Sequence, residues 1–175
     1  MTEWIALLRG VNVGGITVRS AELRETFTGL GFGGVRTVLA SGNVAFESDR
    51  TDAAALKRDI ERALADRFGY EAWIVLLTRE RLGAIVVDFP FDASDASRQP
   101  YVVFASEASV VDDLMAAAGE PDAHADPLER GDGVVYWHPL VGTSVDTAFA
   151  KVLARPVFKP TTTNRNLRTL ERLLG

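Results

Sequence analysis

The sequence predicts an α+β protein made of two ferredoxin-like halves packed together, because the order β-α-β-β-α-β can be followed along its 175 residues twice. Residues 1–78 form the first half, and residues 79–175 form the second half together with a C-terminal helix. A chain of this length suits two small domains of this kind. The halves share little residue identity, so we expect the repeat to be one of architecture.

The first half begins with a short apolar strand. Ile5-Ala6-Leu7-Leu8 is apolar throughout, which predicts a strand buried on both faces. Ser20 is placed to cap a helix that runs to about Leu30. The other elements of this half are a hairpin, a helix and a last strand, which we expect at 35–40 with 44–47, from Asp52 to Phe68, and at 72–77.

The second half repeats this order after a connecting helix at 79–87, for which Thr78 is the expected cap. Its elements are a strand, a helix, a hairpin, a helix and a short closing strand, which we expect at 100–105, 109–118, 128–130 with 134–137, 146–154 and 157–159. Thr163 is then expected to cap a last helix at 165–174.

The composition excludes several classes of protein and site. With 47% hydrophobic and 25% charged residues, the chain is typical of a globular protein rather than a disordered one. It contains no cysteine, which excludes disulfides, thiolate metal sites and a cysteine nucleophile. A basic-then-apolar leader and an apolar run of membrane length are both absent, so we expect a soluble cytoplasmic protein with no membrane partner.

The net charge of −5 is unevenly distributed. Residues 88–132 contain 11 Asp and Glu against 2 Lys and Arg, whereas residues 151–175 contain 6 basic residues and 1 acidic residue. The basic segment is either an attraction for phosphates or the solvated face of a terminal helix. Overall acidity argues against a broad nucleic-acid footprint, and this segment alone keeps such a partner open.

Polar and glycine residues follow the first strand directly, as Arg9-Gly10-Val11-Asn12-Val13-Gly14-Gly15. In a ferredoxin-like sheet the first and third strands are antiparallel neighbours, so the end of the first strand should lie beside the turn Ser41-Gly42-Asn43. This edge would present a guanidinium, two amides, a hydroxyl and glycine N–H groups, which suits an anion. The alternative is structural, because asparagines stabilise turns and Arg9 can pair with a carboxylate.

Other chemistries have little support in the residues. His124 and His138 lack the spacing of metal ligands, so no metal site is expected, and catalytic residues and cofactors stay unknown. Neither a Walker loop nor a G-x-S-x-G nucleophile elbow occurs. RNA-recognition modules of this fold stack bases on aromatic residues of the central strands, where this chain offers only Phe46.

Three segments resemble the bacterial "domain of unknown function 1697" family: residues 9–15, Ser41-Gly42-Asn43-Val44, and Arg165-Asn166. The third segment departs from the family pattern, because Asn164 and Leu167 stand where the family has threonine and tryptophan. The resemblance implies a duplicated ferredoxin-like fold and no particular function. It adds Thr163, Arg165 and Asn166 to the candidate site, either as an anion pocket at a helix N-terminus or as an ordinary capped helix start.

The leading hypothesis is a module that binds a small ligand bearing phosphate or carboxylate. The expected ligand-binding residues are Arg9, Asn12, Gly14, Gly15, Ser41, Gly42, Asn43, Thr163, Arg165 and Asn166. One alternative is an enzyme acting on an anionic metabolite or nucleotide, with Ser41 or an unplaced carboxylate transferring a proton. Another is an RNA- or protein-interaction module, since a fold alone fixes no function. The oligomeric state stays open.

Overall fold

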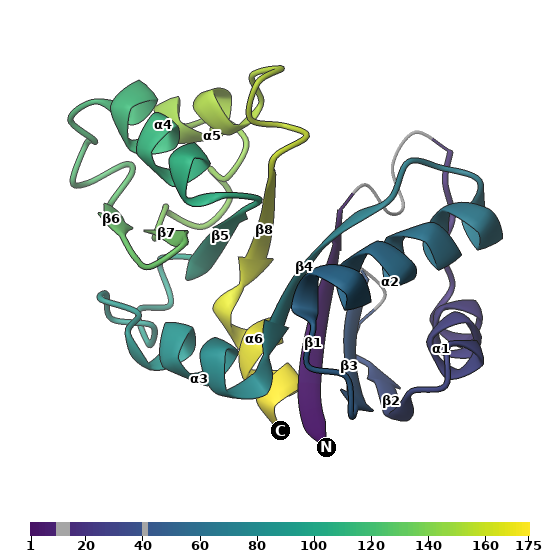
Figure 1. Ribbon diagram of the computed structural model, residues 1–175. Helices are drawn as coiled ribbons and strands as arrows, with labels where there is room; N and C mark the ends of the chain where they lie inside the picture. The colour runs from purple at the N-terminus through teal and green to yellow at the C-terminus, as the bar shows by residue number, and fades with distance from the viewer. Residues whose placement is uncertain (10–14, 40–41) are drawn as a thin grey trace. The chain divides into compact units, whose positions relative to one another are not determined.

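The computed structural model of the protein describes residues 1–9, 15–39 and 42–175, and the chain divides into two units (Figure 1). The first unit contains Met1–Gly83 and Arg172–Gly175, and the second contains Ala84–Glu171. The predicted halves differ from these units by residues 79–83 and 172–175. Within the described ranges, none of the helices is long and apolar enough to cross a membrane.

Each unit contains a four-stranded antiparallel sheet with the same strand order. In the first unit the order is β2-β3-β1-β4, and in the second it is β6-β7-β5-β8. The strands are β1 (Thr2–Arg9), β2 (Gly33–Thr37), β3 (Asn43–Ser48), β4 (Trp73–Thr78), β5 (Tyr101–Ala105), β6 (Leu128–Arg130), β7 (Val134–Trp137) and β8 (Thr162–Asn166). The β-α-β-β-α-β order of each unit confirms the predicted ferredoxin-like architecture.

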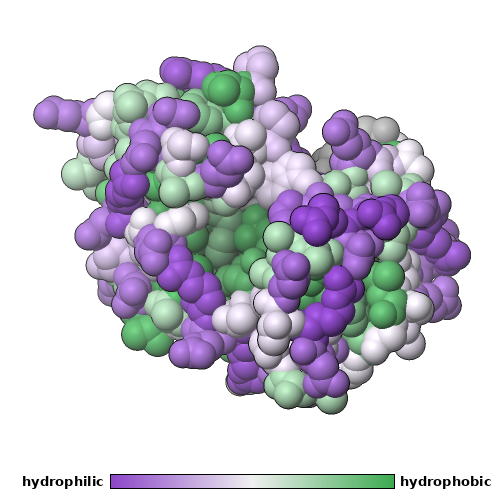
Figure 2. Space-filling model, in the orientation of Figure 1, coloured by the Kyte–Doolittle hydropathy of each residue, from purple (hydrophilic) through white to green (hydrophobic). Residues whose placement is uncertain are grey.

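In the part of the chain that the structure describes, four helices belong to one unit each, and two carry the chain from one unit to the other. The first group is α1 (Ser20–Gly29), α2 (Ala53–Phe68), α4 (Ala108–Ala118) and α5 (Ala148–Leu153). The connecting helices are α3 (Arg79–Val87) and α6 (Leu167–Leu174). On α2 the outward face carries Arg58, Arg62 and Asp66, and hydrophilic side chains cover this part of the surface (Figure 2).

The two faces of β1 are both buried, as its apolar run predicted. Ala6 and Leu8 join the core of the first unit with Phe27 of α1 and Ile60 of α2. Because successive residues of a strand point to opposite faces, Ile5 and Leu7 lie on the other side, and both are fully buried. The buried strand therefore fixes the position of its last residue, Arg9, at the end of the sheet.

Helix caps agree with the sequence at α2 and α3 and differ at α1. The Asp52 carboxylate accepts a hydrogen bond from the amide of Ala55 at 3.0 Å, and Thr78 Oγ1 accepts one from the amide of Arg81 at 3.2 Å. The prediction that Ser20 caps α1 was wrong. Arg19 occupies the N-cap position, and no side-chain cap bond is present there among the described residues.

A buried carboxylate organises the core of the second unit. Asp126 accepts hydrogen bonds from Trp137 Nε1 at 3.0 Å and from the backbone amide of Phe149 at 3.1 Å. The Trp137 and Phe149 rings also pack edge to face, with centroids 5.3 Å apart. These bonds join β7 to the start of α5 and satisfy the carboxylate, which burial would otherwise penalise.

The end of the second unit differs most from prediction. Residues 157–159 form no strand, and the closing strand is β8, which pairs with β5 from Ala105 opposite Thr162 to Tyr101 opposite Asn166. Thr163 and Arg165 are therefore strand residues, and the last helix begins at Leu167 instead of 165. The physical reason is that buried β5 needs a backbone partner on its second edge, and the Thr-Thr pair suits a strand.

Candidate functional site

The end of β1 and the turn before β3 lie side by side, as the topology predicted. Leu7 stands opposite Asn43 in the β1–β3 ladder, and the amide of Leu8 donates to the carbonyl of Gly42 at 2.9 Å. Arg9, the last residue of β1, follows Leu8 in the chain and pairs with Trp73 of β4. Of the other predicted site residues in this region, Asn12, Gly14 and Ser41 lie outside the described residues.

Arg9 places a partly desolvated cation at this strand end. By strand alternation its side chain shares a face with Ile5 and Leu7, and Trp73 of β4 stands directly opposite it. Burial lowers the pKa of the guanidinium, but an arginine keeps its charge throughout the physiological range. An anion that reaches this position therefore meets a charge that water screens less than at an open surface.

The turn before β3 has the backbone that its glycine predicts. Gly42 has a φ of 78°, in the left-handed region that favours glycine. Asn43 is fully buried and donates from Nδ2 to the carbonyl of Val38 at 3.0 Å, while its own carbonyl accepts from the amide of Val38 at 3.0 Å. Asn43 thus closes the β2–β3 connection, which is the structural role considered for it. Gly15, also predicted for the site, has a φ of 83°.

The third predicted segment lies on β8 in the second unit. Arg165 Nη1 donates to Thr163 Oγ1 at 2.6 Å and to the carbonyl of Asn164 at 3.0 Å. Asn166 Oδ1 accepts from the amide of Arg168 at 2.9 Å, and its Nδ2 donates to Gln99 Oε1 at 3.0 Å. The expected helix N-terminus at Thr163 was wrong, because it is Asn166 whose side chain accepts from the first turn of α6.

The comparison with protein families tests the resemblance seen in the sequence. The family model described as "Protein of unknown function (DUF1697)" matches residues 1–136. The chain belongs to the DUF1697 family. Among curated proteins none matches it. The predicted family resemblance is thereby confirmed.

A solved structure extends this similarity over the whole DUF1697 chain. It is the conserved bacterial protein SP0830 from Streptococcus pneumoniae, which is 28% identical to this chain. The similarity has a TM-score of 0.82 and covers 99% of this chain and 97% of that one. The fold described above is therefore shared with that bacterial protein.

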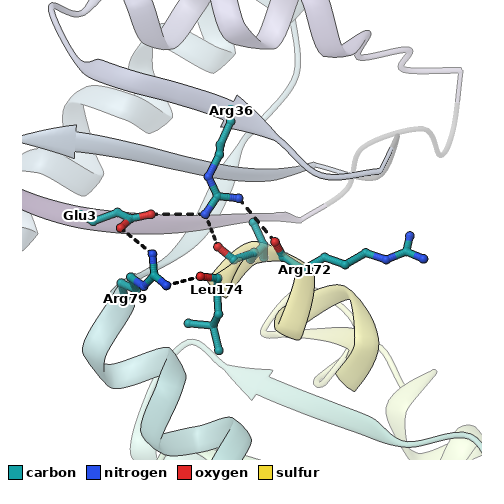
Figure 3. Close-up of polar contacts among 6 residues, drawn as sticks. Glu3, Arg36, Arg79, Arg172 and Leu174 are labelled. Carbon is teal, nitrogen blue, oxygen red and sulfur yellow. Dashed lines mark hydrogen bonds and ion pairs between the residues drawn. The ribbon is translucent and has the colours of Figure 1, made fainter.

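Sequence reasoning missed a polar cluster in the first unit of this DUF1697 protein (Figure 3). The Glu3 carboxylate receives Arg36 Nη2 at 3.3 Å and Arg79 Nη1 at 3.0 Å. The same arginines donate to backbone carbonyls at the end of α6, Arg36 to Leu173 and Arg79 to Leu174. Cationic side chains at a helix C-terminus donate to its free carbonyls and are attracted to the negative end of the helix dipole. This cluster therefore has a structural role.

Sequence reasoning also missed a cavity of about 410 Å³ in the second unit. Its lining residues are Phe91, Asp92, Asp95, Arg98, Pro121, Ala123, Pro127, Leu128 and His138. Sequence reasoning considers His138 only as a candidate metal ligand and sets that role aside because it lacks the spacing of metal ligands. No group of three or more potential metal-ligating side chains occurs in the ranges that the structure describes.

Proposed function

We propose that this DUF1697 protein binds a small ligand bearing a phosphate or carboxylate group, and that Arg9 holds that group at the end of β1. The observation that carries this proposal is the position of Arg9, partly buried at the end of a strand whose inner residues are fully buried. Turn formation alone requires no cation there. Arginine offers a planar pair of donors that matches phosphate and carboxylate oxygens.

The neighbouring backbone supports the proposal. The β1–β3 ladder brings the Gly42 turn to the same edge, next to Leu8. Glycine turns let a ligand approach the backbone closely, and their N–H groups favour anions. Asn12, Gly14 and Ser41 remain part of the predicted site, whereas Asn43 is accounted for by its turn contacts.

The central strands favour a small ligand over RNA. Phe46 of β3 is fully buried and packs against Phe27 and Phe32, with ring centroids 5.3 and 4.6 Å away. It is therefore a core residue and offers bases no stacking surface. Ile5 and Leu7, on the other face of β1, are aliphatic and buried, so this face offers bases no aromatic surface either.

A thermal-shift and calorimetry series tests the proposal, with inorganic phosphate, pyrophosphate, citrate and nucleotides as probes. A probe at one hundred times its Kd stabilises the fold by about 2.7 kcal/mol. For a chain of this size that raises Tm by about 5–11 °C. We expect Arg9→Gln to lose this shift, and Arg9→Lys to retain part of it because lysine keeps the charge without the planar fork.

Arg62→Gln is the matched control, because Arg62 is exposed on α2 and lies 3.9 Å from Asp59. It should bind the probes as the unmodified protein does. The Tm of each unliganded variant shows whether it folds. Equal anion binding by folded Arg9→Gln and Arg62→Gln would refute the assignment of the site to Arg9.

A further inference from the structure

The cavity of the second unit is separate in sequence and chemistry from the β1 site. Its volume of about 410 Å³ is within the range of pockets that hold small organic molecules. Phe91, Pro127 and Leu128 supply an apolar wall. A ligand with a hydrocarbon or aromatic body would therefore be favoured over a bare ion.

One buried side-chain nitrogen beside this wall has no hydrogen-bond partner among the described residues. His138 is only 3% exposed, and its Nε2 makes no hydrogen bond within the described parts of the chain. Burial and the nearby Arg98 charge lower the pKa of the imidazole, so at neutral pH the ring is uncharged. A neutral imidazole nitrogen left unpaired in the interior is unfavourable, and a ligand hydroxyl would satisfy it whether the nitrogen donates or accepts.

The charges around the cavity favour a cation. Arg98 donates to the carbonyls of His138 and His124 at 2.9 and 2.8 Å, and its Nε lies 3.9 Å from the Asp95 carboxylate. Asp95 therefore offsets the charge of Arg98. Asp92 adds a second carboxylate, so the three charged groups sum to one negative charge.

The Asp92 carboxylate also has an oxygen, Oδ2, that can accept a hydrogen bond from a ligand. Its Oδ1 accepts from the amide and hydroxyl of Ser94 at 3.0 and 2.5 Å. No hydrogen bond from the described residues reaches Oδ2. The Ser94 bonds hold the pKa of the Asp92 carboxyl below its usual value, so the group is ionised at neutral pH.

We propose that this cavity binds a small organic monocation with an apolar body and a hydroxyl group. The ammonium lies at Asp92, the body packs on Phe91 and Leu128, and the hydroxyl pairs with His138 Nε2. Nε2 is covered in the structure, so binding of the hydroxyl requires the side chains around it to move. The Phe91 ring lies nearly parallel to the imidazole, with centroids 5.4 Å apart, so a ligand body on Phe91 lies next to His138.

Three related probes separate the parts of this proposal. Tyramine has the ammonium, the aromatic body and the hydroxyl, phenethylamine lacks the hydroxyl, and 3-(4-hydroxyphenyl)propionate reverses the charge. We expect calorimetry to rank tyramine above phenethylamine and to detect no binding of the propionate. Tyramine, but not phenethylamine, should also shift the NMR resonance of His138 Nε2 in the unmodified protein.

Variants locate the contacts. Asp92→Asn should weaken tyramine binding at least about tenfold, which is 1.4 kcal/mol. Asp113→Asn is the control, since Asp113 is an exposed carboxylate on α4, and it should bind tyramine normally. His138→Phe, checked for folding by its Tm, should bind the two amines equally.

Several results would overturn the proposal. One is the failure of both amines to bind at up to about 10 mM, well above a millimolar Kd. Equal binding of the propionate and tyramine is another, and unchanged tyramine binding in Asp92→Asn is a third. None of these results bears on Arg9, so the two sites are tested independently.

Discussion

At the scale of single residues, two buried polar side chains differ in whether their hydrogen bonds are made. Asn43 is fully buried and hydrogen-bonded to Val38, whereas His138 is almost fully buried and its Nε2 makes no hydrogen bond to any described residue. A buried amide whose hydrogen bonds are made fixes a local conformation. A buried neutral imidazole instead lowers the stability of the fold at acidic pH, because the unfolded chain takes up a proton more readily. Each residue therefore gives a separate prediction.

Asn43→Ala should lower the free energy of unfolding by about 1–3 kcal/mol, because it leaves the part-buried carbonyl of Val38 without the donor that Asn43 supplies. Urea unfolding followed by circular dichroism measures this difference. Asn164→Ala is the control, since Asn164 is exposed on β8, and its effect should stay within about 0.5 kcal/mol. Equal effects of the two substitutions would show that Asn43 does not hold the turn.

His138 should make stability depend on pH just below neutrality. Its pKa in the folded protein is lowered from the ordinary 6.5, so the unfolded chain binds the proton more readily. Stability should therefore be full above pH 6.5 and fall as the pH drops below that value. Urea unfolding of the unmodified protein and of His138→Phe at a series of pH values measures this. The decline in that window should be absent in His138→Phe, and its persistence there would assign it to another group.

At the scale of elements, the structure shows which sequence signals are sufficient to predict where a helix or strand begins and ends. The hairpin strands β6 and β7 and the helix α3 occupy the predicted residues, because an Asp-Gly turn and a Thr cap define their ends locally. β8 could not be found this way. Thr-Thr-Asn-Arg-Asn has no apolar alternation, and it becomes a strand because the edge of β5 is available to it.

The cap of α6 provides a test at this scale. Asn166→Ala should cost about 0.5–2 kcal/mol, because the amide of Arg168 loses its acceptor. Thr163→Val should cost less, since valine is also β-branched and Arg165 Nη1, which loses Thr163 Oγ1, still has the carbonyl of Asn164 as acceptor. Urea unfolding of both variants measures the difference. A larger loss for Thr163→Val would restore Thr163 as the residue that governs the helix start.

At the scale of the whole molecule, the duplicated fold was predictable and the clusters between distant segments were not. The proximity of Arg9 to the Gly42 turn followed from strand order, since β1 and β3 are neighbours in any sheet of this topology. The Glu3 cluster joins residues from β1, β2 and α3, and the cavity joins Phe91 to His138. No local pattern links such positions, so only the folded chain reveals them.

The central claim is that an anion binds at the end of β1. Its most direct measurement is a backbone NMR titration of the unmodified protein with inorganic pyrophosphate. We predict saturable shifts of the amides of Leu8, Arg9 and Gly42, which adjoin the proposed site, and no such shifts in Arg9→Gln. Saturable shifts confined to other residues, or unchanged in Arg9→Gln, would contradict the claim.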